Sequence, residues 1–237
     1  MRILIISDGH GAMQFIDPIK TVAADFDVVL YGGDFAAFKK PETGRPFLER
    51  FAAIHDHIFA VTGNCDEPEF REDLEEYDMS IENSLSYFNG LMLAGSGGGS
   101  KFTGTTPNER TDEELAQDLH LAAESCDATS QTEGKTDQSA WNNLVIITHN
   151  PPKDTKLDTI TNGMHVGSPL IREFIEKYKP LLAVSGHIHE SAAIDTIGAT
   201  TLVNPGALAE GKYAIAEIQG GVNSPFVVSS IELKKLD

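Results

Sequence analysis

Short hydrophobic runs recur along the first 190 residues and alternate with longer amphipathic segments. The runs are rich in Ile, Val and Leu and end in polar or glycine residues, which is typical of buried strands. They cover residues 3–6, 28–31, 58–61, 91–94, 144–148 and 182–185. Helices are predicted between them at 13–24, 46–55 and 169–178, the last with Ser168 as its N-cap. Strands that alternate with helices predict βαβ units.

The pattern changes after residue 190, where four predicted strands follow one another closely. They cover 193–197, 200–203, 213–218 and 226–233, and Gly, Asn and Pro turns separate them. This β-rich tail predicts a meander or second sheet that stacks face to face on the sheet of the first part. With helices on the outer faces, the expected architecture is a layered α/β one, in a single domain covering residues 1–237.

The segment 97–141 interrupts this rhythm and is interpreted as an insertion. It begins with a glycine-rich stretch, contains a predicted helix at 112–124 and ends in the polar stretch 126–140. The polar stretch has too little apolar surface to offset the entropy of ordering. We therefore expect the insertion to be partly mobile.

Charge and cysteine content narrow the functional classes. The chain has 36 acidic and 18 basic residues, and its formal net charge of −18 disfavours a DNA or RNA polymer as the main partner. Two distant cysteines, Cys65 and Cys126, argue against a disulfide framework. The apolar run near the start is too short for a signal peptide or a membrane span. We expect a cytoplasmic protein that does not insert into a membrane.

Seven side chains that commonly bind metals follow the ends of five predicted strands. They are Asp8, His10, Asp34, Asn64, His149, His187 and His189. In open α/β sheets ligands bind beyond the carboxyl ends of the strands, so these residues are expected to converge. Because residues i and i+2 of an extended chain point to the same side, we expect Asp8 and His10 to face one centre together, and likewise His187 and His189.

Imidazole and carboxylate ligands together suit Mn, Fe, Zn, Ni or Co, and no Cys cluster points to a thiolate zinc site. Seven ligands are too many for one ion. Two divalent ions that share Asp34 would leave positions open for water and substrate oxygens. Their positive charge would attract a phosphate even to an acidic protein.

Five short motifs in this order resemble those of a known family. They are D-G-H at 8–10, G-G-D at 32–34, G-N-C-D at 63–66, T-H-N-P-P at 148–152 and G-H-I-H at 186–189, and N-P-G at 204–206 extends the likeness. As a set they resemble the calcineurin-like metallophosphoesterases. The H-V-G-S at 165–168 and G-H-I-H-E at 186–190 are most similar to the small prokaryotic branch related to the Icc protein.

The resemblance implies a fold, a ligand set and a reaction. The implied fold is a four-layer α/β/β/α sandwich of two mixed sheets. One ion would be held by Asp8, His10, Asp34 and His189, and the other by Asp34, Asn64, His149 and His187. The reaction would be hydrolysis of a phosphate ester by a metal-bridging hydroxide, since bound metals lower the pKa of water.

The chain departs from the family at Cys65, where many of these phosphatases have a His that protonates the leaving group. A thiol is a poor hydrogen-bond donor, so Cys65 is either a weak catalytic acid or only fills space beside the metals. His165 could compensate as a catalytic residue, or could be a helix-entry or supporting residue. Lys101 and Arg110 of the insertion either reach a substrate phosphate as part of a lid or are simply solvated.

Three functions are compatible with this site. The favoured hypothesis is a phosphodiesterase that acts on a small phosphate ester such as a nucleotide, because diesters need less protonation of the leaving group than alkyl monoesters. The alternatives are a phosphomonoesterase and a non-catalytic scaffold of the same fold that binds proteins. A nuclease is disfavoured by the acidic charge. A homo-oligomer is compatible with the sequence.

Overall fold

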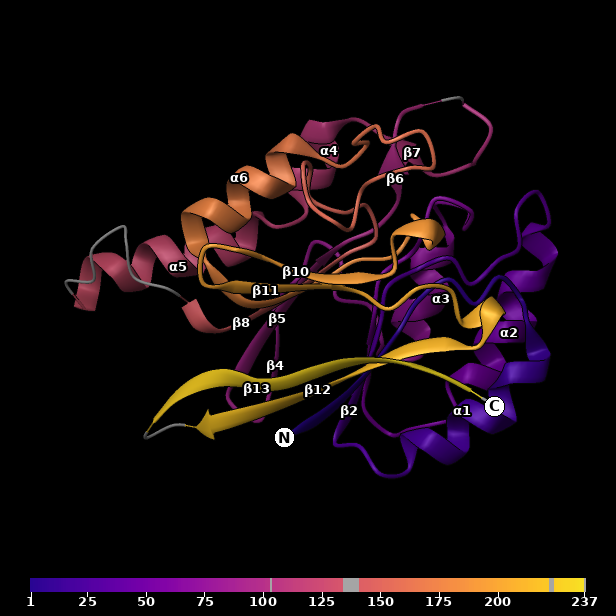
Figure 1. Cartoon of the computed structure of the whole chain (residues 1–237), viewed down its shortest axis with the longest axis horizontal. Coiled ribbons are helices and arrows are strands. Elements are labelled where there is room, and N and C mark those ends of the chain that lie inside the picture. Colours follow the sequence, from indigo (N-terminus) through magenta and orange to yellow (C-terminus); the bar gives the residue numbers. More distant parts are fainter. Residues whose placement is uncertain (103, 134–140, 222–223, 237) are drawn as a thin grey trace.

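The computed structural model describes residues 1–102, 104–133, 141–221 and 224–236, and its strands form two large sheets (Figure 1). The first sheet has the order β13-β12-β1-β2-β3. Its strands are β1 (Arg2–Ile6), β2 (Val28–Tyr31), β3 (Ile58–Ala60), β12 (Lys212–Gly221) and β13 (Ser224–Lys235). Strands β1, β2 and β3 are parallel, whereas β12 and β13 are antiparallel to their neighbours.

The second sheet has the order β10-β11-β9-β8-β5-β4. Its strands are β4 (Ser86–Phe88), β5 (Leu91–Ser96), β8 (Trp141–Thr148), β9 (Pro180–Val184), β10 (Ala193–Ile197) and β11 (Thr200–Asn204). The four central strands are parallel and the two edge strands are antiparallel to them. A separate ribbon pairs β6 (Gly99–Ser100) with β7 (Glu109–Arg110).

Helices cover the outer face of each sheet. The first sheet carries α1 (Ile16–Ala23), α2 (Gly44–Phe51) and α3 (Phe70–Glu76), and the second carries α4 (Asp112–Gln117), α5 (His120–Glu133) and α6 (Pro169–Tyr178) (Figure 1). Short 3-10 turns lie at Met13–Phe15, Pro41–Thr43, His189–Ser191 and Leu208–Glu210. The described helices are all too short or too polar to cross a membrane.

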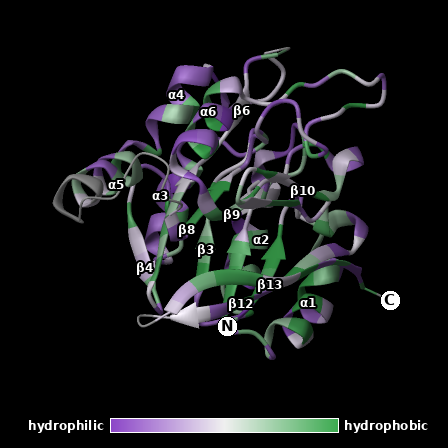
Figure 2. Ribbon diagram, turned by 60° about the vertical axis from the view of Figure 1, so that its left-hand side comes forward, coloured by the Kyte–Doolittle hydropathy of each residue, from purple (hydrophilic) through white to green (hydrophobic). Residues whose placement is uncertain are grey.

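Alternation within the hydrophobic strands produces the layers. In β1, Leu4 and Ile6 pack against α1 and α2, while Ile3 and Ile5 face the second sheet. Each strand therefore contributes to two cores, because successive side chains point to opposite faces. In β8 the residues 145 and 147 face the first sheet, whereas 144 and 146 pack against the helices of the second sheet. Figure 2 shows these central strands as largely hydrophobic. The predicted four-layer α/β/β/α sandwich of two mixed sheets is confirmed.

The prediction that the tail forms a sheet of its own is wrong. Strands β10 and β11 extend the second sheet through β9, whereas β12 and β13 extend the first sheet through β1. The cause is burial, because Ala214, Ala216 and Ile218 of β12 pack into the core between the two sheets. That residues 1–237 form one domain stays a prediction.

The insertion is more ordered than its composition predicts. The single helix expected at 112–124 is two helices, and α5 continues through Glu133, so residues 126–133 of the polar stretch are helical. Leu115, Ala122 and Cys126 anchor the two helices in the core under the second sheet. The other part of the polar stretch, 134–140, lies outside the described residues.

Candidate metal centre

The seven predicted ligands lie in loops that leave the carboxyl ends of strands from both sheets. Strands β1, β2 and β3 of the first sheet lead to Asp8, His10, Asp34 and Asn64, and strands β8 and β9 of the second lead to His149, His187 and His189. Most of these side chains are buried, and those of His10, His187 and His189 are partly exposed. The centre therefore lies where the two sheets meet.

Four of the predicted ligands form one group of contacts. His10 Nε2 lies 3.1 Å from His189 Nε2, and His189 Nε2 lies 3.2 Å from Asp8 Oδ1. The carboxylate of Asp34, which follows β2, also approaches His10, and its Oδ2 lies 3.7 Å from His10 Nε2. These are the four residues that the resemblance assigns to one ion.

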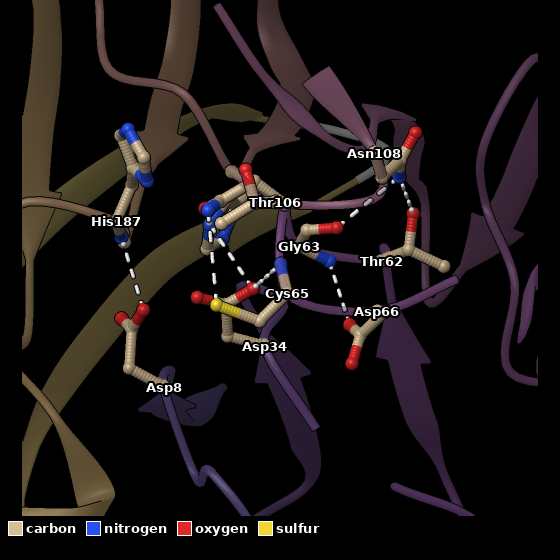
Figure 3. A network of polar contacts seen from close by, with 12 residues as sticks. Asp8, Asp34, Thr62, Gly63, Cys65, Asp66, Thr106, Asn108 and His187 are labelled. Carbon is tan, nitrogen blue, oxygen red and sulfur yellow. Dashed lines mark hydrogen bonds and ion pairs between the residues drawn. The ribbon is translucent and has the colours of Figure 1, made fainter. Parts of the chain in front are cut away.

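The other group surrounds His149. Its Nε2 lies 2.9 Å from Asn64 Oδ1 and 3.6 Å from Asp34 Oδ1. The ring of His187 lies beside that of His149, with 5.1 Å between the centroids, and its backbone N–H donates to Asp8 Oδ1 (Figure 3). Asp34 thus belongs to both groups, and each of its carboxylate oxygens faces a different imidazole.

The hydrogen bonds in this centre leave acceptor atoms facing one another. His10 Nδ1 and His149 Nδ1 lie within 3.0 and 2.6 Å of the carbonyl oxygens of Ala36 and Gly32, so both Nδ1 atoms must donate. In the neutral form of each ring, Nε2 then carries a lone pair. For His149 that lone pair faces the side-chain oxygen of Asn64. A cation between such atoms would satisfy both, and metal-binding imidazoles commonly donate their other N–H to a backbone carbonyl.

A buried carboxylate oxygen supports the same interpretation. Asp8 is fully buried, and its Oδ2 has no hydrogen-bond partner within the described part of the chain. An unpaired buried oxygen of this kind is costly unless a cation binds it. The donor set of imidazole, carboxylate and amide oxygens therefore fits divalent metal ions of the transition series.

The acid–base state of the protein without metal follows from burial and pairing. Burial alone would lower the pKa of His189, but the hydrogen bond to Asp8 and its negative charge raise this pKa to about 9. For Asp8, burial opposes ionisation, yet the bond to His189 and the nearby imidazoles hold its pKa below the usual range. Burial and His149 lower the pKa of His187 to about 4. Asp8 and His189 thus form an ion pair at neutral pH.

The backbone that presents these side chains is not extended, contrary to the sequence-based expectation. Four of the predicted ligands have left-handed conformations, namely Asp8 (φ 56°), His10 (φ 46°), Asp34 (φ 59°) and His187 (φ 66°). This strain costs about 1–3 kcal/mol per residue and clusters at functional sites. Hydrogen bonds between the loops after β1 and β2 hold it, including Asp8 N to Gly33 O and His10 N to Asp34 O, both at 2.9 Å. The side chains converge through these turns and not through strand alternation.

Two supporting residues were not predicted. The buried carboxylate of Asp66 accepts from the backbone N–H groups of Ala36 and Gly63 at 2.7 Å and of Phe35 at 3.2 Å, so it ties the loop after β2 to the loop after β3. Burial and the neighbouring Asp34 raise its pKa to about 6. The hydroxyl of Tyr31 accepts from Gly9 N at 2.9 Å. The position of Asp66 in the G-N-C-D motif was the available signal.

Cys65 lies at the margin of the centre. Its backbone N–H donates to Asp34 Oδ1 at 2.8 Å, and its sulfur lies within 4.8 Å of ligand atoms of His10 and Asp34. Burial and the charge of Asp34 raise the pKa of the thiol well above its usual range. A thiol in this state is a poor proton donor.

His165 lies outside the network of contacts that joins the predicted ligands. Its Nδ1 lies 2.7 Å from Oδ1 of the buried Asp158, and this bond raises the pKa of His165. The next residue, Val166, lines a pocket beside the centre. A catalytic role of His165 stays a prediction.

The two basic residues of the insertion behave differently. The guanidinium of Arg110 pairs with Asp118 and donates to the carbonyls of Gly97 and Glu114, so it is not simply solvated. Its contact with a substrate phosphate stays a prediction. Lys101 is part of the wall of the same pocket as Val166.

Comparison with known proteins places this centre in a family. The model of the calcineurin-like phosphoesterases matches residues 1–191. The uncharacterized protein MJ1162 of Methanocaldococcus jannaschii is 32% identical over 212 residues, which are 86% of this chain and 88% of that protein.

Solved structures share the fold at low sequence identity. TT1561 of Thermus thermophilus has a TM-score of 0.70 at 16% identity, with 100% of this chain and 99% of that chain covered. The NAD nucleotidase of Haemophilus influenzae has a TM-score of 0.56 at 12% identity, and the match covers 100% of this chain and 50% of that chain. The motifs, the two sheets and the matched family model agree, and the chain belongs to the calcineurin-like phosphoesterase family.

Proposed function

We propose that this protein hydrolyses phosphate esters with two divalent metal ions, and that small phosphodiesters are its preferred substrates. The observation that carries this proposal is the position of Asp34. Its Oδ2 lies 3.7 Å from His10 Nε2 and its Oδ1 lies 3.6 Å from His149 Nε2, so one carboxylate faces both groups of predicted ligands. A carboxylate in this position suits a bridge between two ions.

The contact groups suggest which residues would hold each ion. Asp8, His10, Asp34 and His189 would hold one, and Asp34, Asn64, His149 and His187 the other. The ions, Mn, Fe, Zn, Ni or Co by ligand chemistry, would supply Lewis acidity that activates water and neutralises phosphate charge.

The chain itself contributes orientation. The carbonyls of Ala36 and Gly32 fix the rings of His10 and His149 so that both Nε2 atoms point into the centre. The N–H of Cys65 fixes the carboxylate of Asp34. Gly63 lets the loop after β3 approach closely, because a Cβ there would overlap the carboxylate of Asp34. A site held this firmly needs little reorganisation during the reaction.

The preference for diesters rests on the proton supply. The thiol of Cys65 occupies the position of a protonating imidazole in related phosphatases, and burial raises its pKa further. Esters with acidic leaving groups depart without help from a proton donor, whereas alkyl monoesters need one. The substrates expected are therefore diesters, or esters of good leaving groups, of small molecules such as nucleotides.

Hydrolysis of bis-p-nitrophenyl and mono-p-nitrophenyl phosphate, with added Mn²⁺ or Ni²⁺, tests the proposal. The protein should hydrolyse the diester faster, and chelation should abolish the activity. His10→Ala should lose activity, whereas the matched control His57→Ala, at an exposed position, should keep it. Metal-loaded protein that hydrolyses neither ester would refute the proposal and favour a protein-binding scaffold.

A further inference from the structure

A pocket of about 380 Å³ opens directly beside the candidate metal centre. Asn64 and His187 of the centre form part of its wall, and apolar side chains form another part, namely Phe102, Ile160, Val166 and Ile188. Pockets of this size with mainly apolar walls are typical of small-molecule sites. A phosphate at the centre would therefore place its organic substituent next to this pocket.

Phe102 is the notable member of the wall. Its side chain is 81% exposed, the largest value among the large hydrophobic residues of the described chain. A single exposed aromatic ring is common on protein surfaces, but this ring lines the pocket that adjoins the metal centre. An exposed ring face at such a place can stack on a flat ligand.

The loop that carries Phe102 is held by one carboxylate. Glu109 Oε2 accepts from the N–H groups of Phe102 and Gly104, both at 2.9 Å, and its Oε1 accepts from Thr105 N at 3.0 Å and Thr106 N at 3.3 Å. The carboxylate gathers the backbone of the loop around itself. The pocket wall is consequently positioned before any ligand binds.

The same insertion is fastened to the loop that carries Asn64. The side chain of Asn108 donates to Thr62 Oγ1 and to Gly63 O, both at 3.1 Å (Figure 3), and its backbone N–H donates to Asn64 O at 3.2 Å. Gly99 of β6 packs closely against the centre, since a Cβ added there would lie 3.1 Å from Asn64 Cβ and 3.3 Å from His187 Cε1. The pocket therefore has a fixed position relative to the centre.

We propose that this pocket binds the organic group of the phosphate ester, and that this group contains a flat aromatic ring, such as a nucleobase, which stacks on Phe102. The inference rests on the proposed function and narrows its substrate class. The apolar side chains of the wall suit a flat, weakly hydrated group, and Lys101 and Glu109 also line the pocket. Stacking on an aromatic side chain tolerates any base, because every base has a π-face.

Two diesters with the same leaving group test the inference, namely thymidine p-nitrophenyl phosphate and methyl p-nitrophenyl phosphate. Both release p-nitrophenolate, so their ratio of kcat/KM reports only on the other substituent. The wild-type protein should prefer the nucleoside ester. Phe102→Ala should lower the ratio by about tenfold, which is within the range for loss of one stacked base, and Phe102→Trp should preserve it.

Tyr87→Ala is the matched control, because Tyr87 is also an exposed aromatic residue, at 66%, and lies on β4. It should leave both rates unchanged. A ratio that is the same in the wild-type protein and in Phe102→Ala would overturn the inference while the proposed function stands.

A binding measurement separates the two proposals if no ester is hydrolysed. Isothermal titration of the metal-loaded protein with adenosine monophosphate and with inorganic phosphate compares the two ligands directly. Tighter binding of the nucleotide that is lost in Phe102→Ala supports the pocket even without turnover. Equal affinity of the wild-type protein for both ligands would contradict it.

Discussion

The Nε2 atom of His149 lies 2.9 Å from the side-chain oxygen of Asn64, although neither atom can donate to the other in the neutral ring whose proton is on Nδ1. Two lone pairs at this distance repel unless a cation lies between them. Asn64 follows β3 and His149 follows β8, and these strands belong to different sheets, so a cation between the two side chains would lie between the sheets' loops. Metal binding should therefore stabilise the junction of the sheets.

Asn64→Leu tests this link. The change removes the oxygen that faces His149, so the metal-free protein should be no less stable than the wild type. In the wild type, metal at a hundredfold excess over Kd should stabilise the fold by about 2.7 kcal/mol. In Asn64→Leu this stabilisation by metal should fall to less than half of that value. Thermal unfolding with and without Mn²⁺ measures both effects. The control is Asn142→Leu at an exposed position of β8, and an undiminished metal effect in Asn64→Leu would count against the link.

Metal affinity should depend on pH through His189. Its pKa of about 9 means that this imidazole is protonated at neutral pH in the absence of metal, so a bound ion must displace the proton. Affinity should rise by up to about tenfold per pH unit as the pH approaches 9 and then level off. Isothermal titration in buffers of different ionisation enthalpy counts the released protons. Affinity that does not change between neutral pH and 9 would contradict the ion pair with Asp8.

The same ion pair predicts the pH dependence of folding without metal. The pKa of His189 is raised in the folded protein above the ordinary value of 6.5. Its contribution to stability is therefore fully present below 6.5 and is lost as the pH rises through about 9. Urea unfolding of chelator-treated protein should show this loss, and His189→Gln should remove it. A wild-type profile that matches the variant would refute the prediction.

Asp66→Ala should destabilise the protein by at least about 3 kcal/mol, because it leaves three buried backbone N–H groups without an acceptor at about 1–3 kcal/mol each. Chemical denaturation measures the loss. The neighbouring Glu67 is exposed, and Glu67→Ala should change stability by less than about 0.5 kcal/mol. A similarly small effect for both variants would show that Asp66 does not support the centre.

His165→Ala tests whether this residue assists the leaving group. If it donates a proton, hydrolysis of alkyl esters should fall by about a hundredfold and hydrolysis of nitrophenyl esters much less. An NMR titration should also show a His165 pKa above its usual value, and Asp158→Asn should return it toward normal. Equal and unchanged rates for both kinds of ester would exclude the catalytic role.

The sequence predicted the positions of the strands better than their order. The runs at 28–31 and 193–197 match β2 and β10, and Ser168 caps α6 by accepting from Ile171 N at 3.0 Å. Both faces of a strand such as β1 are apolar, so periodicity does not reveal which neighbour it pairs with. The pairing of Arg2 with Glu217 is a contact between distant segments, and only the packing of β12 determines it.

The metal-type residues could be predicted from the sequence because strand ends converge, but the backbone conformation of these residues could not. Nothing in the sequence marks Asp8, His10 and His187 as left-handed, because non-glycine residues rarely adopt that conformation. Arg110 was interpreted as either a lid residue or a solvated one, whereas its guanidinium pairs with Asp118, directly after α4. The partners of residues in polar networks depend on such details of the tertiary structure, which the sequence pattern does not show.

Whether Asp34 bridges two ions can be read from the metal content of the purified protein. Metals are quantified by mass spectrometry in the wild-type protein and in Asp34→Ala after dialysis against Mn²⁺. We expect two ions per chain in the wild type and the loss of both in the variant, since one oxygen of Asp34 faces each group of predicted ligands. One ion in the wild type, or one ion kept at full occupancy in Asp34→Ala, would contradict it.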